Sequence, residues 1–345
     1  MLINVNLRKH SGNIAPEFVR VSLGTAVAIG LVKGKLDAAP TTAYLMTHKQ
    51  GKCNANCGFC PQSRESSSRE DMLSRISWPS FPIDQVTSQL QRAAADGTIK
   101  RVCIQTLHYP EAIADVESLV RTIHKQVAAP ISVSCQPLSI ENVMRLVNAG
   151  AERIGIPLDA ATEEVFNKVK GRSAGGPYRW RNQLKLLRKA AETLGENKVS
   201  THLIVGLGET EKEMFKAIQR CVDMGVQPAL FAFTPIRGTA LEKAGQPPLQ
   251  RYRGIQLARY LILHKIARFE TMQFEKAGNL ADFGVEKERL DRIIKTGEPF
   301  LTSGCPNCNR PYYNEKPSGP FYNYPRPLSE AEIADIKLEL RISGE

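Results

Sequence analysis

Short apolar segments of high β-strand propensity alternate with amphipathic segments of helical period from residue 42 onward. Expected strands are 42–47, 99–106, 130–136, 153–158, 198–207, 228–234 and 271–276, and expected helices are 83–95, 111–127, 140–148, 181–194, 210–224 and 249–264. Repeated strand–helix units of this kind build a parallel sheet covered by helices. The pattern therefore predicts an α/β fold, a partial or complete (β/α) barrel, with its chemistry at the carboxyl ends of the strands.

Two segments fall outside this alternation and predict a three-part organisation. Residues 1–40 are expected to form an N-terminal helical extension, 41–298 the barrel, and 299–345 a tail with a short helix near 330–341. The apolar run 21–32 is too short to span a bilayer, so we expect an amphipathic or buried helix there. The aromatic residues of the tail would be costly to leave in water together, so the tail is expected to be ordered.

The net charge and the cysteine content argue against a nucleic-acid-binding protein and against a disulfide-stabilised one. The formal net charge is +11, but the basic residues are scattered among apolar positions without a run of like charge. Such scattering is typical of solvated helix faces and argues against nucleic-acid binding. Eight cysteines in 345 residues do not make a disulfide scaffold. The close spacing of five of them suits metal ligation in a reducing compartment, so we expect a cytoplasmic protein with no membrane association.

Three cysteines directly follow the first expected strand. Cys53, Cys57 and Cys60 form a C-x3-C-x2-C loop that offers three thiolates around one point. A [4Fe-4S] cluster held by three thiolates leaves one iron free to chelate S-adenosylmethionine (SAM), whose reductive cleavage gives an adenosyl radical. The alternative is a structural zinc knuckle, but zinc knuckles usually join one C-x2-C pair to a second pair. The loop therefore predicts catalytic ligands of an iron–sulfur cluster.

The residues around this loop resemble those of the radical SAM family. An aromatic residue, Phe59, precedes the last cysteine, and Pro61, Gln62 and Ser63 follow it; the CPQS run is similar to biotin synthase and its relatives. Residues 198–209, KVSTHLIVGLGE, resemble the strand and glycine turn that contact the cofactor in that branch. The resemblance covers roughly residues 41–280.

This resemblance implies several cofactor contacts. Phe59 is expected to lie against the adenine, and Asp159 to contact the substrate or the ribose. Gly206 and Gly208 would let the backbone approach the ligand, and Glu209 would open the following helix. For Asp159 the alternative is a helix N-cap before residues 160–166.

A second metal site is expected inside the barrel. Cys103 and Cys135 fall in the second and third expected strands, where the resemblance to biotin synthase implies ligands of an auxiliary cluster. The third cysteine of that set is replaced here by Ser200, and the tail adds Cys305 and Cys308 in a C-x2-C. Cys103, Cys135, Cys305 and Cys308 are thus expected to ligate an auxiliary iron–sulfur cluster.

Simpler interpretations stand beside this one. A lone cysteine in an apolar strand is usually a small core residue, which is the alternative for Cys103 and Cys135, and Cys221 on a helix is expected to be core. The pair Cys305 and Cys308 is a metal knuckle for which zinc is the alternative to iron.

The reaction implied is sulfur insertion at an unactivated carbon. The apolar run 155–159, GIPLD, suits an acyl chain better than a ureido ring, whose polar groups would need partners. The core, the N-terminal extension, the loop 63–79 (SRESSSREDMLSRISWP) and the GCPNCNRPYYNE tail together resemble one component of a two-protein lipoyl synthase. That resemblance implies a lipoyl-carrier protein or small acyl substrate, a second radical SAM subunit, and an electron donor such as ferredoxin or flavodoxin.

Other functions remain open on the sequence. One is a biotin synthase-like enzyme acting in biotin synthesis, or as a mutase, methyltransferase or cofactor-maturation factor, with structural zinc in the tail. A tRNA-modifying protein would require a clustered positive face. A non-catalytic iron–sulfur carrier would leave the three-cysteine loop and the GLGE turn without a purpose.

Overall fold

Six parallel strands form the centre of the main sheet in this computed structural model, which describes residues 16–340. They are β2 (Thr42–Thr47), β6 (Arg101–Gln105), β7 (Ile131–Ser134), β8 (Ala151–Gly155), β9 (Val199–Val205) and β10 (Gln227–Ala232). The sheet order is β10-β9-β8-β7-β6-β2-β1-β5, so strands that follow one another in the parallel part are neighbours in space. The predicted α/β fold is confirmed, and the sheet is open, as in a partial barrel.

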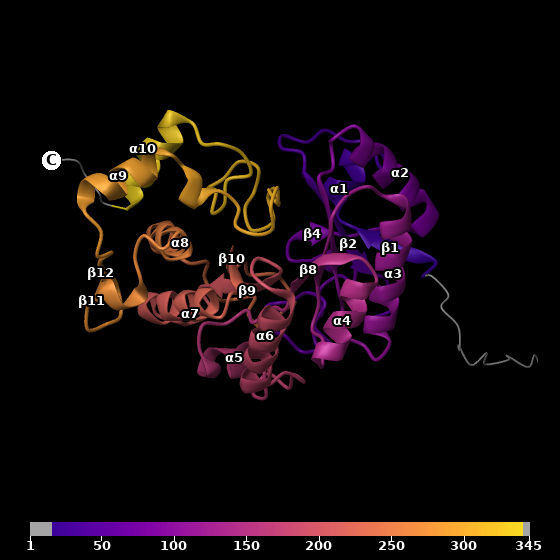
Figure 1. The fold of residues 1–345 in the computed structure, drawn as a ribbon, viewed down its shortest axis with the longest axis horizontal. Coiled ribbons are helices and arrows are strands. Elements are labelled where there is room, and N and C mark those ends of the chain that lie inside the picture. The colour runs from indigo at the N-terminus through magenta and orange to yellow at the C-terminus, as the bar shows by residue number, and fades with distance from the viewer. Residues whose placement is uncertain (1–15, 341–345) are drawn as a thin grey trace, which may run out of the picture.

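Helices cover the outer face of this curved sheet. They are α2 (Ile83–Ala95), α3 (Ala112–Gln126), α4 (Ile140–Asn148), α5 (Glu163–Val169), α6 (Trp180–Leu194), α7 (Glu211–Asp223) and α8 (Leu249–Leu263). In Figure 1, α2, α3 and α4 flank one side, and α5 to α8 continue around the other. The amphipathic period predicted six of these helices, and α5 is an addition.

The N-terminal segment contributes a strand as well as a helix. β1 (Phe18–Val21) pairs antiparallel with β2 on one side and with β5 (Ser80–Pro82) on the other. Helix α1 (Leu23–Ala28) is shorter than the expected 21–32 helix. The strand forms because its valines pack fully buried in the core while its backbone pairs with the edge of β2. The remainder of the expected extension, residues 1–15, lies outside the described residues.

The seventh expected barrel strand is wrong. Only Gln273–Phe274 (β11) is extended, and it pairs antiparallel with β12 (Leu280–Asp282) in a separate hairpin. A second small hairpin, β3 (Met72–Leu73) with β4 (Ile76–Ser77), lies between β2 and β5 in the chain. Helices α9 (Lys287–Lys295) and α10 (Glu330–Glu339) follow, the latter as expected. Within residues 16–340, no helix has the length and apolar character needed to cross a membrane.

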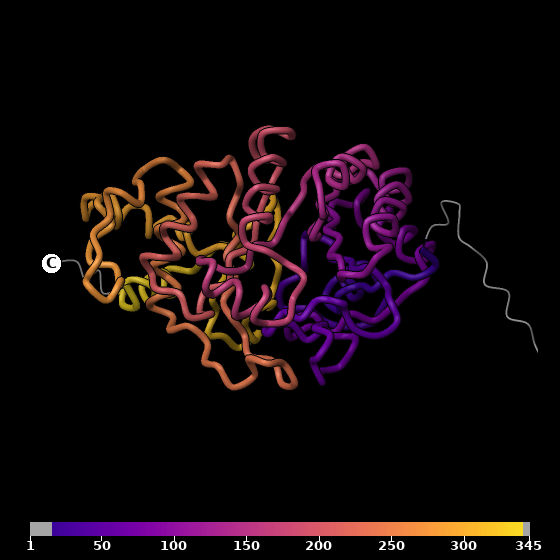
Figure 2. Tube along the Cα trace, turned by 90° about the horizontal axis from the view of Figure 1, so that it is seen from below, coloured from indigo at the N-terminus to yellow at the C-terminus, as the bar shows by residue number. Residues whose placement is uncertain are grey.

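The tail is ordered and bridges β10 and β2, the two outermost strands of the parallel part of the sheet. Ser303 Oγ accepts a hydrogen bond from Leu230 N of β10 at 2.7 Å, and Asn309 Oδ1 accepts one from Thr41 N, just before β2, at 2.9 Å. Figures 1 and 2 show the tail between the α8 and β10 side and the N-terminal side of the molecule. The tail therefore closes the cavity that the open sheet leaves.

Candidate functional site

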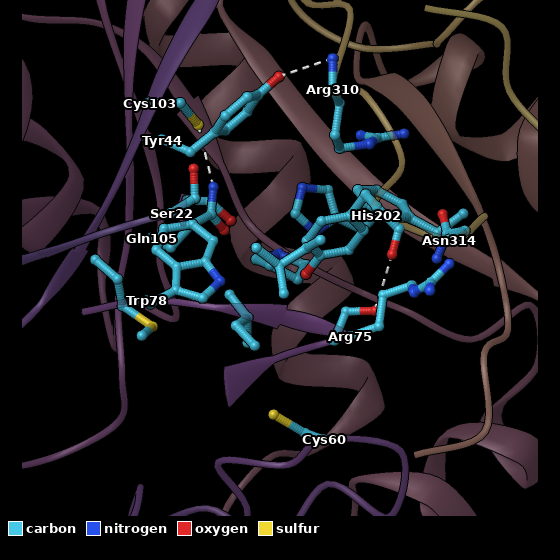
Figure 3. A pocket seen from close by; sticks show the side chains of 18 of the residues that line it. Ser22, Tyr44, Cys60, Arg75, Trp78, Cys103, Gln105, His202, Arg310 and Asn314 are labelled. Carbon is cyan, nitrogen blue, oxygen red and sulfur yellow. Dashed lines mark hydrogen bonds between the residues drawn. The ribbon is translucent and has the colours of Figure 1, made fainter. Parts of the chain in front are cut away.

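One cavity of about 600 Å³ lies inside the curved sheet. The cysteine loop, the β3–β4 hairpin, the inner ends of the strands and the tail all line it. Every cysteine predicted as a ligand is on its wall: Cys53, Cys57, Cys60, Cys103, Cys135, Cys305 and Cys308. Cys60 and Cys103 lie on opposite sides of the cavity in Figure 3. Cys221 is buried in α7 and does not line it, as expected of a core residue.

The backbone of the cysteine loop is fixed at both ends. Cys53 N donates to Gln62 O at 2.9 Å, which closes the loop on itself. Gly58 N donates to Val169 O at 2.7 Å, which ties the loop to the end of α5. Gln62 is fully buried, and its side-chain amide donates to the carbonyls of Glu70 and Met72. The glutamine of the CPQS run thus anchors the chain that leads into the β3–β4 hairpin.

The three loop thiols are partly buried and face the cavity. Burial raises the pKa of Cys60 to about 12, and it raises the pKa of Cys57 as well. The backbone N–H of His108 lies 3.1 Å from Cys53 Sγ and can donate to it. Thiolate ligation to a metal offsets such a burial penalty, and N–H donors to the sulfur tune the bound group.

A second group of thiols lies at the other end of the cavity. Sheet register aligns Tyr44 of β2, Cys103 of β6 and Ser132 of β7 in one row. The tail cysteines contact both flanking members of this row: Tyr44 Oη is 3.3 Å from Cys308 Sγ, and Ser132 Oγ is 3.3 Å from Cys305 Sγ. Burial raises the pKa of Cys103, and the nearby Cys305 and Cys308 raise it further. The structure therefore brings Cys103 and both tail cysteines together.

The tail loop that carries this pair covers the amino ends of the parallel strands. Arg101, the first residue of β6, contacts Pro306 O at 3.4 Å through Nε. Gln227, the first residue of β10, donates to Gly304 O at 3.1 Å. The cysteine loop follows the carboxyl end of β2, so the two thiol groups occupy opposite ends of the barrel.

Cys135 lies apart from the second group. In the register, Cys103 is opposite Ser132, and Cys135 lies three residues further along. At about 3.3 Å per residue this is roughly 10 Å along the strand direction. Cys135 is 1% exposed, and burial alone raises its pKa to about 12. The structure thus groups three of the four predicted auxiliary ligands.

Zinc and iron both remain alternatives for the tail pair. Zinc requires ligand atoms about 2.0–2.3 Å from one point. Among residues 16–340, no three His, Cys, Asp or Glu side chains converge closely enough to hold a single metal ion.

Asp159 lines the cavity in an ion pair that the sequence did not reveal. Its Oδ2 lies 2.6 Å from Lys170 Nζ, and the side chains are 9% and 1% exposed. Lys170 also donates to Pro157 O at 2.9 Å. The N-cap alternative for Asp159 is wrong, because Thr162 caps α5 and Asp159 has a φ of +67°.

The GLGE turn is held by its own glutamate. Glu209 is 2% exposed and accepts hydrogen bonds from Gly206 N at 2.8 Å and Leu207 N at 3.0 Å. Burial raises the pKa of Glu209, while these donors and Arg251 oppose the shift. Phe59 lines the cavity, whereas Gly206, Gly208 and Glu209 do not. The cofactor contacts expected of this turn stay a prediction.

The structure adds cavity residues that the sequence analysis did not single out. His202 of β9 lines the cavity, and burial lowers its pKa to about 4, so its imidazole is neutral at pH 7. Arg310 of the tail places its guanidinium 3.7 Å from the ring centroid of Phe231. Arg75, on the turn of the β3–β4 hairpin, and Trp78, just after β4, also line the cavity, from different sides in Figure 3. Their segment carried part of the sequence resemblance, but nothing in its pattern placed these side chains in a cavity.

Biotin synthases are among the known proteins whose sequences are similar to this chain. The chain is 26% identical over 231 residues to the biotin synthase of Acinetobacter calcoaceticus, covering 65% of this chain and 66% of that protein. It is 26% identical over 275 residues to the biotin synthase of Synechococcus sp. (strain WH7803), covering 76% and 78%. The chain thus spans about two thirds of the first of these relatives.

Two solved structures share the fold. Methylornithine synthase (PylB) aligns with a TM-score of 0.50 and 14% identity, covering 64% of this chain and 62% of that chain. The FeFe-hydrogenase maturase HydG from Carboxydothermus hydrogenoformans aligns with a TM-score of 0.53 and 17% identity, covering 79% and 69%. The model of the radical SAM superfamily matches residues 48–221, from the cysteine loop through α7. With half of the chain matched and the three loop cysteines facing a cavity inside a partial barrel, this protein belongs to the radical SAM superfamily.

Proposed function

We propose that this protein inserts sulfur into an unactivated carbon chain, and that its substrate is a protein-bound octanoyl chain that becomes a lipoyl group. One observation carries the proposal. Two separate groups of cysteines, the loop at one end and Cys103 with the tail pair at the other, face the same cavity. A substrate between them would be within reach of both groups.

The first group suits the cofactors that the family implies, a [4Fe-4S] cluster and SAM. The chain supplies three thiols on a fixed loop and an N–H donor aimed at Cys53, which match a cluster with one iron left for SAM. When bound, the pair supplies an adenosyl radical that abstracts hydrogen from carbon. The residues of this chain hold the loop through Gln62 and Val169 and place the loop thiols on the wall of the cavity.

The second group supports an auxiliary iron–sulfur cluster as the sulfur source. Cys103, Cys305 and Cys308 come from segments about 200 residues apart in sequence, yet they share one end of the cavity. Tyr44 and Ser132 place hydroxyl groups against the two tail sulfurs. Hydroxyl groups at this distance can donate to thiolate ligands, and such hydrogen bonds tune a bound cluster.

The lining of the cavity supports an aliphatic substrate. Met46, Ile76, Phe231 and Phe233 are among its apolar residues, and an apolar wall accommodates methylene groups without leaving polar groups unpaired. Biotin synthesis is the second candidate, because biotin synthases are among the relatives that match this chain.

The partners of this activity are also proposals. A lipoyl-carrier protein would present the octanoyl chain, and the net charge of +11 favours docking of an acidic carrier. A second radical SAM subunit would share the work, and ferredoxin or flavodoxin would supply the electron. A cytoplasmic location would keep both thiol groups reduced.

Iron and sulfide analysis with Mössbauer spectroscopy tests this proposal. We expect the triple variant Cys53→Ala, Cys57→Ala, Cys60→Ala to keep one cluster of roughly four irons and to lose SAM cleavage. The double variant Cys305→Ala, Cys308→Ala should lose the other cluster and keep SAM cleavage. Cys221→Ala, a buried cysteine outside the cavity, is the matched control and should keep both.

The proposal fails if the triple variant holds zinc and no iron. It also fails if the wild-type protein with both clusters adds no sulfur to an octanoyl-lysyl carrier or to dethiobiotin under strong reductant. Product formation from only one of these two substrates would decide between the two candidate functions.

A further inference from the structure

Four polar groups on the cavity wall have no hydrogen-bond partner among the described residues: Trp78 Nε1, Thr106 Oγ1, Asn314 Oδ1 and the guanidinium of Arg75. The indole Nε1 of Trp78 and the amide Oδ1 of Asn314 make no hydrogen bond, although these residues are 2% and 5% exposed. Arg75, on the turn of the β3–β4 hairpin, has no ion pair and no hydrogen bond to any described residue. Because buried polar groups are nearly always paired in folded proteins, the buried atoms among these indicate a bound molecule, and the partly exposed Arg75 adds a positive charge to the same cavity.

The other charged side chains of the lining are already paired. Lys170 is bound to Asp159, and Arg310 donates to Leu230 O at 3.1 Å while it stacks on a ring. Glu315 accepts backbone N–H donors from Asn314 and Asn323. Arg75 is therefore the charged side chain without an ion pair or hydrogen bond among the lining residues that the structure describes.

The hairpin and the tail hold these groups in place. Ser74 Oγ donates to Tyr313 O at 3.2 Å, which fixes the hairpin turn next to Asn314. In Figure 3, Arg75 and Asn314 lie on one side of the cavity, and the indole nitrogen of Trp78 faces its interior from the other. The polar groups therefore flank a common space.

Their chemistry specifies the kind of molecule that fits. A guanidinium binds a carboxylate through two parallel hydrogen bonds. An indole N–H donates to a carbonyl oxygen, and an amide oxygen accepts from an N–H group. A simple fatty acid has no N–H to offer Asn314, and a neutral amide has no charge to offer Arg75.

We propose that the cavity binds a substrate that carries a carboxylate and a neutral amide-type group joined by aliphatic carbon. Arg75 binds the carboxylate on the side of the cavity where Asn314 also lies, and Trp78, across the cavity, donates to the carbonyl oxygen of the amide-type group. This inference rests on the proposed function for the aliphatic chain and adds the polar groups by which the substrate is recognised. Two sources have this chemistry: an acyl-lysyl peptide with an acidic residue beside the lysine, and a cyclic urea acid such as dethiobiotin.

Equilibrium binding to the anaerobically reconstituted full-length protein tests the proposal without requiring turnover. The probes are an octanoyl-lysyl peptide with a flanking glutamate, the same peptide with glutamine, dethiobiotin, octanoate and octanamide. Arg75→Gln should weaken binding of the preferred carboxylate-bearing probe by about 10- to 100-fold and change octanamide binding less than about twofold. Arg69→Gln is the matched control, since Arg69 lies on the same segment but is exposed and paired with Asp71.

A second variant separates the amide contact from the charge. Trp78→Phe removes the N–H and keeps a ring of similar shape, so it should weaken every amide-bearing probe by about 3- to 10-fold and leave octanoate unchanged. Tighter binding of the glutamate peptide than of dethiobiotin identifies a carrier substrate, and the reverse identifies a free acid.

Three results would overturn the proposal. One is equal weakening of all probes by Arg75→Gln, which would mark a structural role. Another is wild-type protein that binds no carboxylate-bearing probe better than octanamide. The third is loss of SAM binding in Arg75→Gln, which would assign this arginine to the cofactor. None of these depends on sulfur insertion, so failure here is distinct from failure of the proposed function.

Discussion

Removing one partner of the buried Asp159–Lys170 pair should destabilise the protein strongly. Both side chains are under 10% exposed, and their charged atoms are 2.6 Å apart. Lys170→Met leaves the Asp159 carboxylate without a cation in a buried site, and Asp159→Asn leaves the ammonium group without an anion. Breaking a buried pair in this way typically costs about 3–5 kcal/mol. The double variant removes both charges and should cost no more than either single one, which corresponds to a coupling energy of about 3 kcal/mol or more.

An exposed pair on α5 provides the control. Lys168 and Glu164 are 2.8 Å apart at i,i+4 spacing, with side chains 67% and 77% exposed. Pairs of this kind contribute about 0.3–0.5 kcal/mol. The cycle of Lys168→Met and Glu164→Gln should therefore give a coupling energy several times smaller than that of the buried pair, although the N···O distances are similar.

Urea unfolding followed by circular dichroism measures both cycles in cluster-free protein, so that loss of a cofactor does not mix with loss of stability. The slope of the unfolding free energy against urea concentration should be the same in every variant, because a changed slope would mean that the unfolded or folded state itself differs. A coupling energy below about 1 kcal/mol for Asp159 and Lys170 would refute the reasoning, because it would mean that water screens this pair as it screens an exposed one.

Two further predictions concern the same region. His202 has a pKa of about 4 in the folded protein and about 6.5 when unfolded, so the unfolded state takes up a proton first as the pH falls. The free energy of unfolding should therefore be unaffected at pH 7 and should decrease by about 3 kcal/mol as the pH falls from about 6.5 toward 4. Urea unfolding of cluster-free His202→Gln should show a flatter pH dependence over that window, and an unchanged slope would contradict the assignment. Gly206→Ala should destabilise the fold by about 1–3 kcal/mol, since its Cβ would meet Pro247 at 3.0 Å at a φ of +100°. Gly208→Ala, with a φ of +115° and nothing within 4 Å, should cost less, and equal thermal shifts for the two would show that the contact with Pro247 is unimportant.

The sequence predicted the strand–helix units well because each has a strong period of its own. Expected helices 83–95 and 140–148 coincide with α2 and α4, and expected strand 42–47 coincides with β2. Expected strand 271–276 failed because its extended residues pair locally with β12. The β3–β4 hairpin has two residues in each strand, which is too short for any hydrophobic period to show.

The candidate site was predictable where residues lie close in sequence. The three loop cysteines needed only their spacing. The meeting of Cys103 with the tail pair was expected from the resemblance to biotin synthase together with the tail C-x2-C, whereas the separation of Cys135 depends on sheet register, which spacing along one strand does not reveal. Arg75 and Trp78 line the cavity because Gln62 and Tyr313 anchor the hairpin, a tertiary arrangement without a local signal.

The position of the tail in the sequence determines the order in which the parts of the cavity can form during synthesis. Every parallel strand leaves the ribosome before the segment that closes the cavity, so the growing chain carries Cys103 without its two neighbours. Domains fold progressively from the N-terminus during synthesis, and incompletely closed intermediates expose apolar surface. A chain interrupted before residue 300 would therefore display the lining of its cavity and be a target for chaperones and proteases. The second thiol group is therefore complete only after the tail that carries Cys305 and Cys308 has been synthesised.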